Sequence, residues 1–181
     1  MFETPSTEND NPKKARRYYD LTAPITPDTV VYPGDPKFST EVIATLENGE
    51  QFHLCHMHLG NHTGTHIDFP AHVVKGGKSS RDFPINDLIG SGLIIEVPAT
   101  EKSITRAFIE SQCSIAKKDF IFFKTSNSKL SKQAAFTDKY VYIEPEAAAE
   151  LIRKGVKIVG IDYISVDSYD AEDLPVHRML L

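Results

Sequence analysis

The 181-residue sequence predicts one domain of the α/β or α+β class. Its length suits a single domain with a sizeable core, and its 40% apolar and 25% charged residues are typical of globular proteins. Strand-like and helix-like segments follow one another along the chain, with more strand than helix and no internal repeat. This mixture favours a sheet packed against helices.

The composition of the chain indicates where it is disordered and which partners it lacks. Residues 1–17 are rich in polar residues and proline, which predicts a disordered N-terminal arm, with the domain expected over residues 18–181. The first residues lack the features of a signal peptide, and no run reaches the roughly 18 apolar residues of a membrane span. We therefore expect a cytoplasmic protein without a membrane partner. The net charge of -5 argues against a nucleic-acid partner, because no basic surface is available for phosphates.

Strands are expected in the first third of the chain. Residues 18–35 predict a short strand followed by turns, since the run PGDP is a strong turn signal. Residues 38–47 and 51–59 predict two strands, and an interrupted alternation in the second allows a bulge. Residues 60–77 are rich in Gly, Thr, Asp and Pro and predict a loop with at most a turn or two of helix.

The rest of the chain predicts alternating strands and helices. The apolar runs SGLIIEVPA and FIFFKTS predict buried strands, and residues 105–116 between them predict a helix. The segment EPEAAAELIRKG predicts a second helix, because Pro145 lies near its start and Gly155 lies just past its end. The segment VKIVGIDYISVD predicts a strand that leads into a loop.

Six of the seven histidines lie between His53 and His72, in and before the predicted loop. In an extended strand, His62 and His66 would be about 13 Å apart, too far to share one ion. The chain must therefore bend between them, and Gly64 at the centre can adopt a conformation that other residues avoid. The spacing H-x3-H-x-D then brings His62, His66 and Asp68 to one face as candidate metal ligands.

Three protein ligands and an open position are what a catalytic metal needs. Two histidines and a carboxylate suit Zn²⁺ or Mn²⁺, and such an ion acidifies bound water and polarises a carbonyl group. His72 remains, and we predict that it shuttles a proton, since the ordinary pKa of histidine suits that task. His53, His56 and His58 are interpreted as ordinary strand residues or as supports of the ligands.

The segment HTGTHIDFPAH resembles the H-x-G-T-H-x-D-x-P-x-H signature of the cyclase-like metal-dependent hydrolases. That family includes bacterial kynurenine formamidases, isatin hydrolases and proteins that were once named as polyketide cyclases. The resemblance spans roughly residues 18–181 in the order of the family. It includes the segments DLTAPITPDTVVYPGDP, FIFFKTS, IEPEAAAELIRKGVKIVGIDYISVD and LPVHRMLL.

The resemblance implies a fold and further site residues. The implied fold is a compact α/β domain of the swivelling β/α/β type, with a β-barrel-like mixed sheet flanked by helices, assembled as a homodimer or homotetramer. His62, His66 and Asp68 would be ligands, with Asp68 able to bridge two ions, and His177 would bind a second ion or the same site. The late glutamate and final apolar strand of the family have no counterpart before Leu181, so a site for one ion is the minimum expectation.

The function expected from the resemblance is hydrolysis of a small amide, formamide or lactam such as N-formylkynurenine or isatin. Metal-bound hydroxide would attack the carbonyl carbon, and His72 would protonate the leaving nitrogen. Phe69, Phe52 and Tyr32 are candidates for an aromatic pocket or for plain core. Two alternatives stay open: a protein that binds metal or ligand without catalysis, and a cyclase or lyase acting on a polyketide-like substrate.

Overall fold

A computed structural model of the chain covers most of the sequence. It describes residues 17–115, 119–130, 133 and 135–181. The N-terminal arm predicted over residues 1–17 therefore lies outside the described residues, apart from Arg17.

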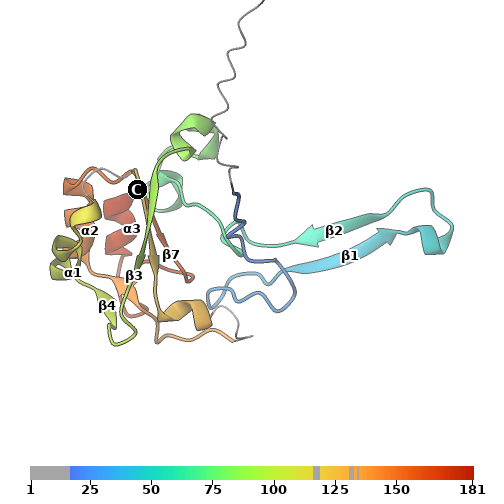
Figure 1. Cartoon of the computed structure of the whole chain (residues 1–181). Coiled ribbons are helices and arrows are strands. Elements are labelled where there is room, and N and C mark those ends of the chain that lie inside the picture. Colours follow the sequence, from blue (N-terminus) through green and yellow to red (C-terminus); the bar gives the residue numbers. More distant parts are fainter. Residues whose placement is uncertain (1–16, 116–118, 131–132, 134) are drawn as a thin grey trace, which may run out of the picture.

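A parallel sheet of three strands forms the centre of the fold (Figure 1). Its strands β3 (Gly92–Glu96), β5 (Phe120–Lys124) and β7 (Ile158–Ile161) are hydrogen-bonded in the order β3-β5-β7. Parallel neighbours need long crossovers. The two crossovers contain β4 (Ser103–Ile104) and β6 (Tyr142–Ile143), which pair with each other in parallel as a second small sheet.

Three helices lie on one side of the central sheet (Figure 1). They are α1 (Arg106–Ser111), α2 (Pro145–Arg153) and α3 (Pro175–Leu180), and α2 packs between the other two. Thr105 caps the start of α1 by accepting a hydrogen bond from the Phe108 amide at 3.1 Å.

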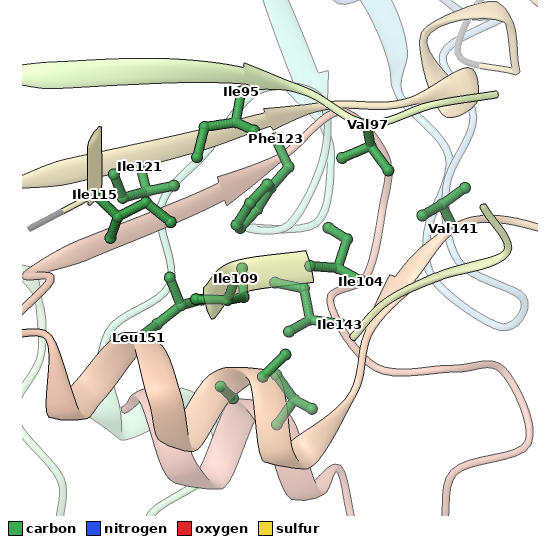
Figure 2. Close-up of a cluster of buried hydrophobic side chains, with 13 residues drawn as sticks. Ile95, Val97, Ile104, Ile109, Ile115, Ile121, Phe123, Val141, Ile143 and Leu151 are labelled. Atoms are coloured by element: carbon green, nitrogen blue, oxygen red, sulfur yellow. The ribbon is translucent and has the colours of Figure 1, made fainter. Parts of the chain in front are cut away.

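The main core lies between the sheet and these helices. Figure 2 shows Ile121 and Phe123 of β5 pointing toward Ile109 of α1 and Leu151 of α2. Ile109, Ile121 and Leu151 are fully buried, and Phe123 is 2% exposed. Alternate residues of a strand point to opposite faces, so Phe122 points away from the helices and remains partly exposed.

Truncating Leu151 is expected to destabilise the fold far more than truncating its neighbour. Leu151→Ala should lower the free energy of unfolding by about 2–5 kcal/mol, because it removes buried methyl groups and leaves a cavity. Ile152 is 46% exposed, so Ile152→Ala serves as the matched control and should cost much less. Urea unfolding measures both. Equal losses would contradict this description of the core.

A hairpin projects from the body of the protein (Figure 1). Its strands β1 (Ser39–Ala44) and β2 (Leu54–His58) pair antiparallel as a separate sheet. Most of its side chains are exposed, including large apolar ones such as Val42, Leu54 and Met57. The hairpin is therefore held by its own pairing more than by the main core.

No helix in the described part of the chain is both long and apolar enough to cross a membrane.

The predicted class is confirmed, since parallel and antiparallel strands combine with helices in one α/β domain. The described strands are divided among three sheets, where the resemblance implied one barrel-like sheet. Both predicted helices are present, and α2 is followed by Gly155 with φ +76°. Residues 60–77 form a loop with one turn of 3-10 helix, as predicted.

Three details of the secondary-structure prediction were wrong. The described residues before Ser39 contain turns and irregular chain but no strand, because three prolines between Pro24 and Pro33 remove the amides that a strand would donate. The bulge lies in β1, between Val42 and Ala44, and not in β2. The strand β3 is buried on one face only, since Ile94 is 56% exposed.

Candidate metal centre

The loop after β2 makes the bend that the histidine spacing requires. A turn closes between Gly60 and Thr63, whose backbone amide donates to the Gly60 carbonyl at 3.1 Å. Gly64 follows with φ +70°, and a Cβ there would lie 2.9 Å from Cγ1 of Ile25. Both the backbone conformation and the contact require glycine. The expected bend at Gly64 is thus confirmed.

This bend brings together the three residues predicted as first ligands. Nδ1 of His62 lies 2.7 Å from Oδ1 of Asp68 and 3.2 Å from Nε2 of His66. Nε2 of His66 lies 3.4 Å from the same Asp68 oxygen. The three side chains are 22–25% exposed. Two imidazole nitrogens and one carboxylate oxygen therefore meet at a single point, formed by side chains that are mostly buried.

The Asp68 oxygen at this point lacks a hydrogen bond. Oδ1 is buried, yet no described residue donates to it with proper geometry, although the two imidazole nitrogens are near. A buried carboxylate oxygen without a partner is costly. A tetrahedral ion with bonds of about 2.0–2.2 Å has donors roughly 3.3–3.6 Å apart. The observed separations of 2.7–3.4 Å are close to that, so a divalent ion fits after the donors spread slightly.

Neighbouring polar groups orient the two imidazoles. The Gly64 carbonyl accepts a hydrogen bond from Nδ1 of His66 at 2.8 Å, which leaves Nε2 free to face Asp68. The side-chain amide of Asn61 lies 2.9 Å from Nε2 of His62 and turns the Nδ1 edge of that ring inward. Contacts of this kind fix the ring orientation of metal-binding histidines.

His177 reaches the same carboxylate from the far end of the chain. Its Nε2 lies 3.8 Å from Oδ2 of Asp68, so the two Asp68 oxygens face different histidines. Arg178 on the same helix donates to the Val73 carbonyl at 2.9 Å, which ties α3 to the histidine loop. No sequence spacing connects residues 68 and 177, and only the fold brings them together.

Asp167 is a buried partner of His177 that was not predicted from the sequence. It is 1% exposed and accepts from Nδ1 of His177 at 2.6 Å. It also accepts from the backbone amides of Val176 and His177. Burial opposes its ionisation, but these hydrogen bonds keep the pKa of Asp167 below its usual value. The segment ISVD contained the residue, and nothing in its spacing indicated the role.

His72 lies beside the three donors on the 3-10 turn Pro70–His72. Its ring centroid is 4.0 Å from that of His62 and 5.5 Å from that of His177. One donor atom each from His62, Asp68 and His72 lies within 4.8 Å of the other two. The fold therefore brings together all five residues singled out from the sequence as ligands or proton carrier.

The charges in the cluster shift several pKa values. Burial disfavours the charge of Asp68, but the close approach of His66 and the attraction of the other nearby imidazoles outweigh it and lower the pKa of Asp68 to about 2. The Asp68 carboxylate in turn raises the pKa of His66. Burial, followed by repulsion from neighbouring imidazoles, lowers the pKa of His72, although Asp68 acts in the opposite direction. His72 is thus held neutral more readily than an ordinary histidine.

A largely apolar cavity of about 420 Å³ opens beside the cluster. His66, Asp68 and His177 form one wall, and Phe122 and Gly160 of the central sheet form part of another. Its size and lining are typical of small-molecule sites.

The aromatic residues proposed from the sequence for a pocket do not line this cavity. Phe69 packs against Phe83 with ring centroids 5.1 Å apart, and Phe52 is 55% exposed. Tyr32 packs against Phe136 and Tyr169. Nearness in sequence to the histidines was a poor guide, because the wall comes from strands far along the chain.

The sequence profile of the family described as "Putative cyclase" matches residues 19–168. The chain belongs to this family. The family predicted from the sequence is thus confirmed. As a member of the cyclase family, the chain is 34% identical over 163 residues to a kynurenine formamidase from Salinibacter ruber. That match covers 90% of this chain and 76% of the relative.

Solved structures agree with the family assignment. A predicted metal-dependent hydrolase from Bacillus stearothermophilus is 32% identical, with a TM-score of 0.72 over 90% of this chain and 76% of that one. An isatin hydrolase bound to the product analogue thioisatinate shares the fold at 22% identity, with a TM-score of 0.74 over 89% of this chain and 74% of that one. The cyclase-family fold of this chain is therefore supported independently by sequence and by structure.

Proposed function

We propose that this cyclase-family protein is a metal-dependent hydrolase of a small amide, formamide or lactam. The observation that carries the proposal is the buried Oδ1 of Asp68, which faces two imidazole nitrogens beside an apolar cavity that Asp68 helps to line. The kynurenine formamidases among its relatives support a C–N bond outside peptides as the target. The volume of the cavity suits an aromatic substrate of small size.

In this proposal, His62, His66 and Asp68 hold a Zn²⁺ or Mn²⁺ ion. His177 faces the second Asp68 oxygen and is either a further ligand of this ion or a ligand of a second one. Asp167 holds the His177 ring with Nε2 toward the site. When bound, such an ion lowers the pKa of water and polarises a carbonyl oxygen.

His72 is the proton carrier in the proposed reaction. Hydrolysis adds water to the carbonyl carbon, breaks the C–N bond and transfers a proton to the leaving nitrogen. The lowered pKa of His72 keeps its ring neutral near pH 7 and able to accept the proton from water. The protonated ring can then donate to nitrogen. Its position beside His62, at the edge of the donor cluster, suits both transfers.

Turnover of two candidate substrates tests the proposal. Purified protein loaded with zinc or manganese is expected to hydrolyse N-formylkynurenine or isatin, and a chelator should abolish the reaction reversibly. Bound metal without hydrolysis of either compound, or of other small formamides and lactams, would contradict the proposal and favour a protein that binds metal without catalysis. Conversion to a cyclised or eliminated product, seen by mass spectrometry, would favour a cyclase or lyase instead.

Replacement of Asp167 by asparagine is expected to weaken metal binding without removing it. The variant keeps the size of the side chain but removes the negative charge that orients and polarises His177. Loss of such a supporting carboxylate typically lowers metal affinity about 10–100-fold. Competition with a chromophoric chelator measures the change, and Asp170→Asn at an exposed position is the matched control. A folded Asp167→Asn protein with unchanged affinity would show that His177 does not bind the ion.

We also propose that the protein is a homodimer or homotetramer joined through its hairpin. Val42 and Met57 are 56% and 58% exposed on the same face of the hairpin, and exposed apolar patches of this kind favour association. Val42→Asp combined with Met57→Asp is expected to reduce the mass measured by light scattering to that of one chain. A double variant that keeps the wild-type oligomeric state would place the interface elsewhere. A wild-type protein that is already a monomer would contradict the proposed association.

The cytoplasmic location stays a prediction.

A further inference from the structure

We propose that the hairpin carries a second divalent-metal site, formed by Glu41, His56 and His58 and separate from the centre at Asp68. One donor atom from each of these residues lies within 4.8 Å of the other two. The rings of His56 and His58 have centroids 4.2 Å apart. All three side chains are exposed, so an ion can reach them directly from solvent.

The register of the hairpin places these three side chains on one face. His56 and His58 are two residues apart in β2, and residues i and i+2 of a strand point to the same side. Glu41 of β1 is paired directly with His56, and Ser39 is paired with His58. Glu41 is therefore opposite one histidine and diagonal to the other, within reach of both. The opposite, apolar face carries Val42 and Met57. If a second copy of the chain covers that face, the chelating face with Glu41, His56 and His58 stays open to solvent.

The donor set is one that divalent transition metals prefer. Two imidazoles and one carboxylate are the protein ligands of many zinc sites, with further positions open to water. Among the described residues, the Glu41 carboxylate has no ion pair that would compete with a metal. A tetrahedral ion needs donors roughly 3.3–3.6 Å apart, so groups that lie within 4.8 Å of one another need to approach by about 1.5 Å at most. Exposed side chains achieve this by rotating about their χ angles.

An ion held here would connect β1 to β2. It would bind one donor from the first strand and two from the second, across a hairpin that few core residues support. Binding to the folded hairpin alone stabilises it by mass action. The site does not depend on the proposed hydrolase function, because none of its residues belongs to the Asp68 cluster.

Zinc stoichiometry separates this site from the centre at Asp68. In equilibrium dialysis, the full chain is expected to bind about one more zinc equivalent than the double variant His56→Asn/His58→Asn. The same difference should persist when both proteins carry Asp68→Asn. His53→Asn changes a nearby exposed histidine outside the group and should leave the stoichiometry unchanged. Turnover by the zinc-loaded double variant should match wild type within a factor of about two, since the cavity is untouched.

A location measurement completes the test. Cu²⁺ follows the same ligand preferences with higher affinity, and in the Asp68→Asn protein it should broaden the amide NMR signals of Glu41 and His56 before those of α2. The conservative Glu41→Gln variant should weaken this binding by at least about tenfold. Equal zinc stoichiometry in wild type and the double variant, or broadening that spares the hairpin, would overturn the proposal.

Discussion

Replacing Asp68 by asparagine is expected to remove both metal binding and activity. Asp68 is the only residue of the cluster that faces His62, His66 and His177 at once. The amide keeps the shape of the side chain but lacks the negative charge that compensates a divalent ion. We expect kcat/KM to fall by at least about 10³-fold, because the step that activates water is lost.

Metal content and kinetics on one sample check this result. Asp87→Asn, at an exposed position outside the cluster, is the control and should retain both properties. Circular dichroism verifies that Asp68→Asn is folded. A folded variant that keeps its metal at the Asp68 centre and turns over at the wild-type rate would contradict the assignment of Asp68 as a ligand.

Replacing His72 by alanine is expected to slow the reaction while the metal stays bound. General acid–base catalysis by a positioned side chain typically contributes about 10²–10⁴-fold. The change should appear in kcat, since proton transfer occurs after the substrate binds. Loss of metal together with activity would instead make His72 a ligand, a role that its distance to His62 and Asp68 permits.

The pH dependence of the wild-type enzyme gives a second readout for His72. A base must be neutral to accept a proton, so kcat/KM should fall as the pH drops through the pKa of His72. Burial and the neighbouring imidazoles lower that pKa from its usual value, so activity should persist to lower pH than an ordinary histidine would allow. The acidic limb attributed to His72 should be absent in His72→Ala. An identical limb in both proteins would assign it to another group.

The local pattern around the histidines predicted more of the site than of the fold around it. Seven residues contain His62, Gly64, His66 and Asp68. Their mutual geometry depends on one bend, which the glycine indicates because it can adopt a positive φ. His177 was found only through family resemblance, because the 108 residues between it and Asp68 carry no spacing rule. Asp167 was missed for the same reason, as its role exists only when α3 packs beside the loop.

The positions of the later strands were predicted well, because they follow from local apolar runs. Their burial was predicted less well, because it depends on what packs against each face. The segments of β5 and β7 are apolar runs that ended up in one sheet. The burial of β3 was overestimated, since the exposure of Ile94 depends on what covers the second face of the sheet. The chelating face of the hairpin was not anticipated, because the pairing of Glu41 with His56 follows from the register and not from either strand alone.

Anomalous X-ray scattering from a crystal of the zinc-loaded protein tests whether His62, His66 and Asp68 hold a metal ion. We expect a strong zinc peak about 2.0–2.2 Å from Nδ1 of His62, Nε2 of His66 and an oxygen of Asp68. A peak of this kind identifies both the ion and its ligands in one measurement. Zinc-loaded protein whose anomalous peaks lie only elsewhere, with Oδ1 of Asp68 bound by a protein donor, would contradict the metal centre and the hydrolase proposed from it.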